Sequence, residues 1–451
     1  VTPAKAGAHL RVARSGPAEE KPDPGFRPLL SGEIPPRCLE SVAVLGVWGK
    51  TPERQLTSKH RNMFRVSRFQ HLMQDLPRGA CQAIIDRHGA DRYTKGFDCL
   101  SLLTAQVFGH LSGCRSLREL ETGYNAHRAH HYHLGTGPLR RTTLADACAR
   151  RNPQVFAEIV QVLMATVARP VRKQAAECLR LLDSTSFTLK GRGFAWAEAH
   201  RTCHTQGLKL HLVFDPGQAV PVWQDISAAN VNDVTRALEV PLQRGATYVF
   251  DKGYCDYNGW AGFEAAGAWF VTRLKRNAQV AVLDSRPVPA AEQEQVLSDE
   301  LIRFSNRHPG GGRRNRYTAP LRRITVHRPD HATPLVLVTN DLERPAAEIA
   351  ACYRARWQIE LFFKWIKQNL RISRFFGRSE NAVRIQILCA LIAYLLVALY
   401  RARTASHLSM LRVLNELRVA LFQRPAVEAA VEHRRRARWQ AQAAVQPGLF
   451  A

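Results

Sequence analysis

The chain has 451 residues, of which 45% are hydrophobic and 23% charged, and this composition excludes wholesale disorder. Its 64 Lys and Arg residues against 38 Asp and Glu residues give a formal net charge of +26. Because such an excess repels itself unless a polyanion offsets it, DNA or RNA is the first partner to expect, ahead of a membrane surface or an acidic protein. Ten scattered cysteines without a CxxC pair favour a cytoplasmic protein with reduced thiols.

The first part of the chain divides into an unpatterned leader and a helical region. Residues 1–62 contain no Met and are rich in Pro, Gly, Arg and Ala, and Met63 directly precedes the first patterned stretch. We therefore expect the leader to be disordered or not translated, which the intact mass of protein made in its own host tests. Residues 63–170 are predicted to be all-α, because Phe97 to Leu111 repeats apolar residues at helical spacing and Pro153 suits a first turn.

At Cys178 the hydrophobic period changes from helical to alternating. The pattern predicts strands over 178–189, 208–214 and 219–226, a helix over 232–243, a strand over 247–251, a helix over 256–266 and a strand over 269–274. Antiparallel strands followed by alternating helices and strands indicate a mixed α/β sheet with helices on its faces. Residues 276–345 interrupt this rhythm with short strands over 280–282, 321–326 and 334–339, so we expect a β-rich insertion.

The last part of the chain is again helical. Periodicity predicts one helix over 344–370, starting at Pro345, and another over 380–404. The second contains the apolar run 387–400, which at 14 residues is shorter than the roughly 20 that span a bilayer, so we expect a buried core helix and no membrane partner. The tail over 426–451 is basic and is expected to be loose.

Two acidic residues, Asp183 and Asp251, each close an apolar strand. One such residue is commonly a turn cap, but two on adjacent strands of a sheet repel each other and need a cation or a proton. A third candidate group follows in the helix over 344–370, where Tyr353, Arg356, Glu360 and Lys367 have the spacing Tyr-x2-Arg-x3-Glu-x6-Lys. Offsets of 3, 4 and 7 place all of them on one helical face, which is either a salt-bridged solvent face or the lining of a site.

These residues resemble those of the DDE transposases of bacterial insertion sequences, specifically the insertion-sequence-four-type group. The resemblance covers about residues 66–425 and rests on Asp183, Asp251 and the Tyr-Arg-Glu-Lys helix. Supporting segments are FDKGYCDY at 250–257, SGCRSLRELE at 112–121 and TTLADACARRNP at 142–153. The leader has no counterpart in this pattern.

The resemblance implies a ribonuclease-H-like catalytic core at 171–275 and 346–375 that the insertion 276–345 interrupts. A helical DNA-binding domain at 63–170 would precede it, and a helical region at 376–425 would serve assembly. The implied activity is binding of terminal inverted repeats, a metal-dependent cut that frees a 3′-OH, and joining of that 3′-OH to target DNA. The implied partners are double-stranded DNA and a second copy of the chain in a homodimer on DNA, in the bacterial cytoplasm at the nucleoid.

The resemblance also assigns residue roles. Asp183, Asp251 and Glu360 would be catalytic and would hold two Mg²⁺ ions, which Mn²⁺ could replace, with Asp183 bridging both, because hard cations prefer carboxylate oxygens. Tyr353, Arg356 and Lys367 would hold phosphates near the cut strand. Two alternatives stay open: a non-catalytic DNA-binding protein derived from a transposase, and a structure-selective nuclease that cuts without joining.

Several other residues allow two interpretations each. A histidine cluster could bind zinc or form an aromatic-polar turn near DNA, and it comprises His127, His130, His131 and His133. Serines beside Asp183 could be nucleophiles or simple strand residues, namely Ser184 and Ser186. Basic residues could contact phosphate or be solvated, namely Lys252, Arg313, Arg314 and Arg316. Tryptophans could stack on a displaced base, although core packing is the better interpretation for both, namely Trp260 and Trp269.

Overall fold

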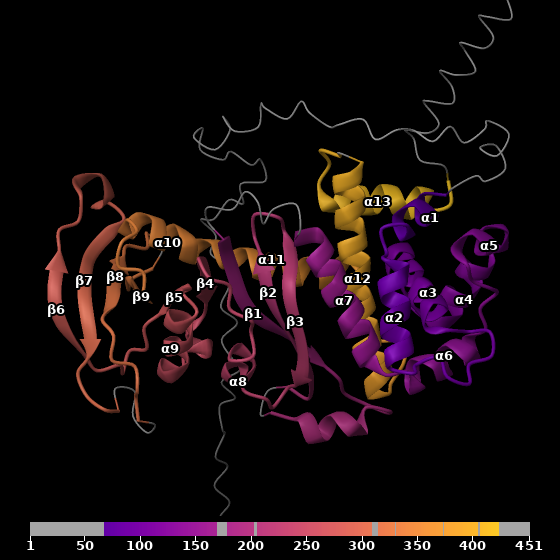
Figure 1. The fold of residues 1–451 in the computed structure, drawn as a ribbon, viewed down its shortest axis with the longest axis horizontal. Helices are drawn as coiled ribbons and strands as arrows, with labels where there is room; N and C mark the ends of the chain where they lie inside the picture. The colour runs from indigo at the N-terminus through magenta and orange to yellow at the C-terminus, as the bar shows by residue number, and fades with distance from the viewer. Residues whose placement is uncertain are drawn as a thin grey trace, which may run out of the picture. The chain divides into compact units, whose positions relative to one another are not determined.

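The computed structural model describes residues 67–168, 178–202, 205–308, 314–329, 331–372, 374–404 and 406–423. The expected leader 1–62 and the basic tail 426–451 lie outside the described residues, as does Arg313. The described segments contain helices before and after one large mixed sheet, so the expected α/β class is confirmed (Figure 1).

The N-terminal region is helical, as predicted. Its helices are α1 (Arg68–Met73), α2 (Arg78–Arg87), α3 (Cys99–Ser112), α4 (Leu117–Asn125), α5 (His131–Leu134), α6 (Arg141–Arg150) and α7 (Pro153–Ala168). Local sequence explains their ends. The Asp98 side chain accepts a hydrogen bond from the Ser101 N–H at 2.7 Å and so caps α3, whose other end is closed by Gly113 at φ +70°. Pro153 is the first residue of α7, a position that needs no N–H donor.

The first five strands form a mixed sheet in the order β3-β2-β1-β4-β5. Their bounds are β1 (Cys178–Thr188), β2 (Gly207–Asp215), β3 (Val220–Ala228), β4 (Ala246–Phe250) and β5 (Trp269–Arg273). Strands β1, β2 and β3 pair antiparallel, whereas β4 pairs parallel with β1 and β5 parallel with β4. This meander followed by parallel strands is the arrangement expected of a ribonuclease-H-like core.

Four further strands extend the same sheet in the order β9-β8-β7-β6. They are β6 (Val280–Arg286), β7 (Val296–Phe304), β8 (Leu321–Val326) and β9 (Leu335–Thr339), and β9 pairs antiparallel with β5. The β-rich character of this segment was predicted, but strand β7 was missed. Its sequence VLSDELIRF places Asp299 on the buried side, where the guanidinium of Arg322 satisfies its carboxylate at 2.8 and 2.6 Å.

Two separate hydrophobic cores lie on opposite faces of the sheet. Because side chains alternate along a strand, Leu181 belongs to one core and Leu182 to the other. The Leu181 face is covered by α10 (Ala346–Ala355) and α11 (Trp357–Asn369), and the Leu182 face by α8 (Asp233–Ala237) and α9 (Tyr257–Ala265). Helix α8 is much shorter than the predicted helix over 232–243, which contains Pro241.

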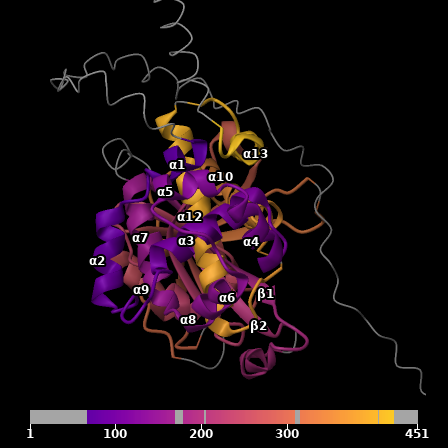
Figure 2. The same ribbon diagram turned by 90° about the vertical axis from the view of Figure 1, so that its right-hand side faces the viewer.

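Helix α12 (Glu380–Arg403) is the centre of the helical region. Its 24 residues exceed the 14-residue apolar run of the sequence, and it is the one helix among the described residues that is long and apolar enough to cross a membrane. Its apolar side chains are instead mostly buried. Helices α3, α6, α7 and α13 (Met410–Ala420) pack against it, and Figure 2 shows α12 among the helices of the N-terminal region. The predicted buried core helix is therefore confirmed, although the argument from its length was wrong.

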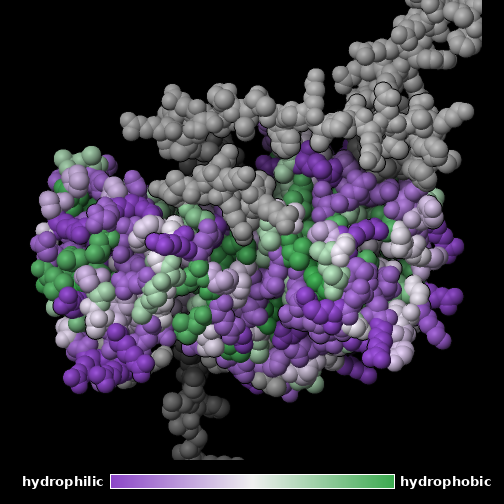
Figure 3. All heavy atoms as spheres, viewed as in Figure 1, coloured by the Kyte–Doolittle hydropathy of each residue, from purple (hydrophilic) through white to green (hydrophobic). Residues whose placement is uncertain are grey.

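The face of the molecule seen in Figure 3 is largely polar, with apolar side chains gathered over β6 and β7. Val282, Leu283 and Leu297 of these strands are each about half exposed. They lie at the outer end of the sheet, far along the strand order from β1 and β4.

Candidate active site

Asp183 and Asp251 lie side by side on two neighbouring parallel strands, Asp183 in the middle of β1 and Asp251 directly after the end of β4. Leu182 of β1 is paired with Phe250 of β4, so the next residue on each strand is the aspartate. Asp183 lies two residues after Leu181, and Asp251 lies two residues after Val249. Because side chains alternate, both aspartates face the side of the sheet that α10 and α11 cover. The two carboxylates therefore adjoin each other, but the expectation that each one closes a strand was wrong for Asp183, because β1 continues to Thr188 in its pairing with β2.

The predicted helix over 344–370 is divided into α10 and α11 at Arg356, so the expectation of one continuous helix was wrong. Arg356 keeps helical backbone angles, φ −51° and ψ −35°, and the following turn is tight, because the Ile359 N–H donates to the Arg356 carbonyl at 3.2 Å. Tyr353 lies on α10, while Glu360 and Lys367 lie on α11.

The junction between α10 and α11 places two of its side chains against the aspartates. The Arg356 guanidinium lies 3.4 Å from Asp183 Oδ2 and 2.6 Å from Glu360 Oε1, and so bridges two of the three carboxylates. The Tyr353 hydroxyl donates to Asp251 Oδ1 at 3.5 Å. Both interpretations of this helical face therefore hold: Arg356 and Glu360 form an i,i+4 ion pair, and together with Tyr353 they line the candidate site.

Lys367 lies further along α11 and contacts no carboxylate of this group. Its Nζ donates to the Ser186 carbonyl at 3.0 Å and lies 5.2 Å from the centre of the Phe187 ring. Burial lowers the pKa of Lys367. The lysine lines an open groove of about 530 Å³ between β1 and α11, together with Asp183, Ser184, Thr185, Glu360, Phe363, Lys364 and Gln368.

The environment of Asp183 disfavours its charged form. Burial raises the pKa of this carboxyl to about 6, and the negative charges of Glu360 and Asp251 add to the effect, while the Ser184 N–H and Arg356 oppose it. Burial, with the charge of Asp251, also raises the pKa of Tyr353 to about 12, which keeps its hydroxyl a donor at neutral pH.

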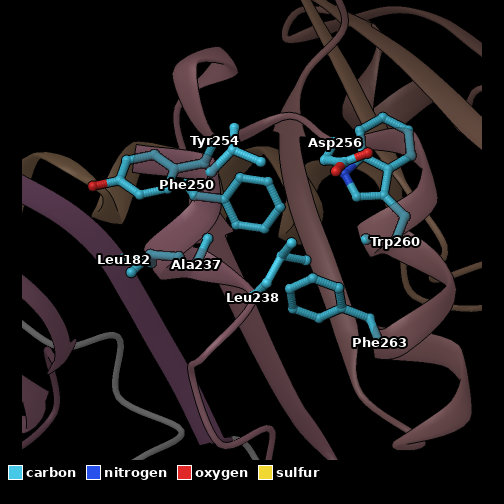
Figure 4. Close-up of a pocket in the computed structure, with 10 residues that line it drawn as sticks. Leu182, Ala237, Leu238, Phe250, Tyr254, Asp256, Trp260 and Phe263 are labelled. Atoms are coloured by element: carbon cyan, nitrogen blue, oxygen red, sulfur yellow. The ribbon is translucent and has the colours of Figure 1, made fainter. Parts of the chain in front are cut away.

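The segment after Asp251 is anchored in the opposite core. A small cavity of about 20 Å³ is lined by Leu182, Phe250, Tyr254, Trp260 and Phe263 among others. In Figure 4 these rings point towards one another from β4, α9 and the turn after Asp251, while the Tyr254 hydroxyl points away from the cavity. Because the space admits little more than one water molecule, this is packing that fixes Asp251 in place and not a ligand site.

The three carboxylates have the donor chemistry of a site for hard divalent cations. Within the described ranges, no three Asp, Glu, His or Cys side chains are arranged so that they could hold one metal ion, and Arg356 contacts two of the carboxylates instead. Burial raises the pKa of Asp183, and repulsion from the nearby charges of Glu360 and Asp251 adds to the effect. A cation would relieve that repulsion, so these residues fit a divalent ion.

The minor candidates resolve mostly into structural roles. His127 stacks on Phe422 at 3.9 Å and His131 on Tyr124 at 4.4 Å, which favours packing over a zinc site. Trp260 is buried against Phe270, so its expected core role is confirmed.

The expectation of core packing was wrong for Trp269. Its side chain is 37% exposed at the start of β5, and the Arg344 guanidinium lies over its ring at 5.7 Å. Lys252, Arg314 and Arg316 are exposed, which is compatible with either interpretation given for them. Ser184 and Ser186 are strand residues of β1, as expected.

Sequence reasoning missed Arg273, the last residue of β5. Its guanidinium lies 3.9 Å from Asp251 Oδ1, on the side of Asp251 away from β1. A lone arginine at a strand end carries no motif, and only the adjacency of β4 and β5 identifies it.

The fold is that of a mixed α/β protein with three carboxylates gathered beside its sheet, and comparisons with known proteins identify its class. A model of the transposase DDE domain matches residues 174–396, which include all six predicted site residues, and a domain of unknown function matches residues 65–137. The chain is 40% identical over 291 residues to "Putative transposase y4zB" of Sinorhizobium fredii, covering 64% of this chain and 79% of that protein.

Two other proteins are similar to parts of the chain. A probable transposase for insertion sequence element IS5377 of Geobacillus stearothermophilus is 26% identical, over 55% of this chain and 65% of that protein. The piggyBac transposase, in a cryo-EM structure of its synaptic complex with hairpin DNA, gives a TM-score of 0.41 at 12% identity, over 79% of this chain and 78% of that one.

The chain belongs to the DDE transposases of bacterial insertion sequences. The resemblance drawn from its sequence is therefore confirmed at the level of the family, and the chain is a transposase. Transposases with this domain generally use divalent metal ions.

Proposed function

We propose that this transposase binds the terminal inverted repeats of its element, cuts there with a divalent metal, and joins the freed 3′-OH to target DNA. The observation that carries the proposal is the adjacency of Asp183 and Asp251 on β1 and β4, with Glu360 linked to Asp183 through Arg356. A protein that only binds DNA gains nothing from three carboxylates turned towards a phosphate, because they repel it.

The chain's own side chains have distinct parts in this reaction. Asp183, Asp251 and Glu360 would hold two Mg²⁺ ions, for which Mn²⁺ could substitute. Bound there, the metal supplies charge relief on the entering and leaving oxygens and a lowered pKa for the attacking hydroxyl. Arg356 and Tyr353 position the scissile phosphate, and Lys367 holds a phosphate further along the groove.

We also propose a role for each domain and a partner for the chain. The helices of residues 63–170 bind double-stranded DNA, residues 171–275 and 346–375 form the catalytic core around the insertion 276–345, and residues 376–425 support assembly. Since two element ends must meet, we propose a homodimer on DNA. The excess of positive charge supports DNA as the partner and a cytoplasmic, nucleoid-associated location.

A strand-transfer reaction tests this function. The full-length chain is incubated with Mg²⁺, a supercoiled target plasmid and a labelled duplex that ends in a pre-cut element terminus. The proposal predicts label joined covalently to the plasmid, and none when the terminal inverted repeat is scrambled. Cutting of an uncut end without any joining would instead favour the structure-selective nuclease. Binding of the terminus with neither cutting nor joining would favour the non-catalytic DNA-binding protein.

Arg356→Gln should change metal binding and DNA binding in opposite directions. Without DNA, the variant should bind Mn²⁺ about tenfold more tightly, because a cation that contacts two of the three carboxylates is gone. It should also bind the element end about tenfold more weakly, through loss of a charge-assisted phosphate contact. Mn²⁺ titration followed by electron paramagnetic resonance, and a DNA titration, measure the two effects.

The matched control is Arg354→Gln, which removes an exposed arginine two residues away on α10. This variant should leave Mn²⁺ affinity unchanged. If Arg356→Gln binds Mn²⁺ as weakly as the wild type, Arg356 does not compete with the metal.

A further inference from the structure

Arg273 continues a row of charged residues across three neighbouring strands. Leu182 pairs with Phe250, and Val249 pairs with Val271. Asp183 follows Leu182 on β1, Asp251 lies two residues after Val249 of β4, and Arg273 lies two residues after Val271 on β5. The three charged residues therefore form one row across the sheet. Leu181, Val249 and Val271 all belong to the core on the α10 and α11 side, so by alternation all three charged residues face that side. The register of the sheet therefore places Arg273 in the candidate active site.

The Arg273 side chain is held too loosely to be a structural ion pair. Its guanidinium is 3.9 Å from Asp251 Oδ1, which is too long for a hydrogen bond, and its side chain is 37% exposed. The structural arginines of this chain are different. Arg322 is 5% exposed and 2.6 Å from Asp299, and Arg180 is 11% exposed and 2.7 Å from Asp215. An accessible guanidinium with most of its five N–H donors available is suited to an incoming anion.

Charge and position indicate which anion Arg273 meets. Arg356 lies on the side of Asp251 towards β1 and α11, whereas Arg273 lies on the opposite side, on β5. Its charge also acts on Tyr353, whose hydroxyl donates to the same Asp251 oxygen. The two arginines thus flank the carboxylates, as a nucleic-acid backbone crossing the site would require.

We infer that Arg273 binds a phosphate of the DNA strand on the β5 side of the cut and so positions that strand across Asp251. The inference rests on the proposed function. It assigns the DNA path a second fixed point: the DNA strand runs across β1, β4 and β5 at the level of Asp183, Asp251 and Arg273, between Arg356 and Arg273.

Single neutral phosphates in the DNA test this contact. The full-length chain is titrated, in EDTA, with element-end duplexes that carry one methylphosphonate at each position around the cut. Wild-type chain should lose about tenfold in affinity at each phosphate that it contacts. Arg273→Gln should bind the unmodified end about tenfold more weakly and should lose nothing further at one of these positions, because the partner of that phosphate is already absent.

Two variants serve as controls. Arg276→Gln removes an exposed arginine three residues away and should keep the complete wild-type pattern. Arg273→Lys should restore the sensitivity of the one position, at lower affinity, because lysine supplies the charge without the planar fork. Thermal melting of each variant confirms that it is folded.

The outcomes separate this inference from the proposed function. Suppose that Arg273→Gln binds and cuts the end but loses affinity at every methylphosphonate position that the wild type does. The inference about Arg273 is then wrong, while the proposed function stands. The same result with slower cutting would mean that Arg273 acts only on Asp251. If the wild type does not distinguish the element end from scrambled duplex, the proposed function fails and the inference fails with it.

Discussion

Asp183→Asn should reduce cutting of the element end by about three orders of magnitude, because metal-assisted charge relief is worth several kcal/mol and each 1.36 kcal/mol is tenfold in rate. Asp183 is the carboxylate that adjoins Asp251 through the sheet and Glu360 through Arg356, so its loss affects the entire group. Asparagine keeps the shape of the side chain and removes its charge. The measurement is the initial rate of appearance of a labelled, shortened strand in Mg²⁺.

The matched control for this variant is Ser184→Ala. Ser184 is the next residue of β1 and also lines the groove, so the variant changes the same stretch of strand without touching a carboxylate. It should cut within a few-fold of the wild type. If Ser184→Ala lost cutting and Asp183→Asn kept it, a serine nucleophile would replace the three-carboxylate account.

Asp183→Asn should also stabilise the chain at neutral pH when no metal is present. The Asp183 pKa is about 6 in the folded chain against an ordinary value of 3.8, so folding favours the protonated carboxyl. At about 1.36 kcal/mol for each pH unit between the two values, the charged form costs roughly 3 kcal/mol of the free energy of unfolding at pH 7.5. The penalty disappears progressively as the pH falls from 6 to below 4, because the carboxyl is then neutral in both states.

Urea unfolding in EDTA at pH 7.5 and pH 3.5 measures this difference. We expect Asp183→Asn to unfold at higher urea than the wild type at pH 7.5 and at nearly the same urea at pH 3.5. Asp86→Asn, on the exposed surface of α2, should match the wild type at both values. A less stable Asp183→Asn at pH 7.5 would mean that the ion pair with Arg356 outweighs the burial of the charge.

The sequence was sufficient to predict the parts of this site that local pattern encodes. An acidic residue that follows an apolar run is visible in the sequence, which is why Asp183 and Asp251 were found, although Asp183 lies in the middle of β1 and only Asp251 follows the end of its strand. Glu360 and Arg356 were found because helical spacing converts directly into a shared face. Most of the core strands were predicted within a residue or two at each end, since their alternation is clear and turn residues bound them.

The features that the sequence did not reveal depend on contacts between distant segments. Arg273 is a candidate site residue only because β4 and β5 are neighbours in the sheet. Strand β7 was missed because its acidic residue is neutralised by Arg322 from the next strand. The break at Arg356 lies in a strongly helical sequence, and α12 owes its burial to helices more than 200 residues earlier in the chain.

We propose that this transposase uses its three carboxylates and a divalent metal to cut DNA at its element's own end. The most direct measurement is to incubate the full-length chain with a labelled duplex spanning that end, in Mg²⁺ and in EDTA, and to map the products to single nucleotides. We predict a nick that leaves a 3′-OH at the element boundary in Mg²⁺ and intact DNA in EDTA. Equal cutting in EDTA, or a bound end that stays uncut in Mg²⁺, would contradict it.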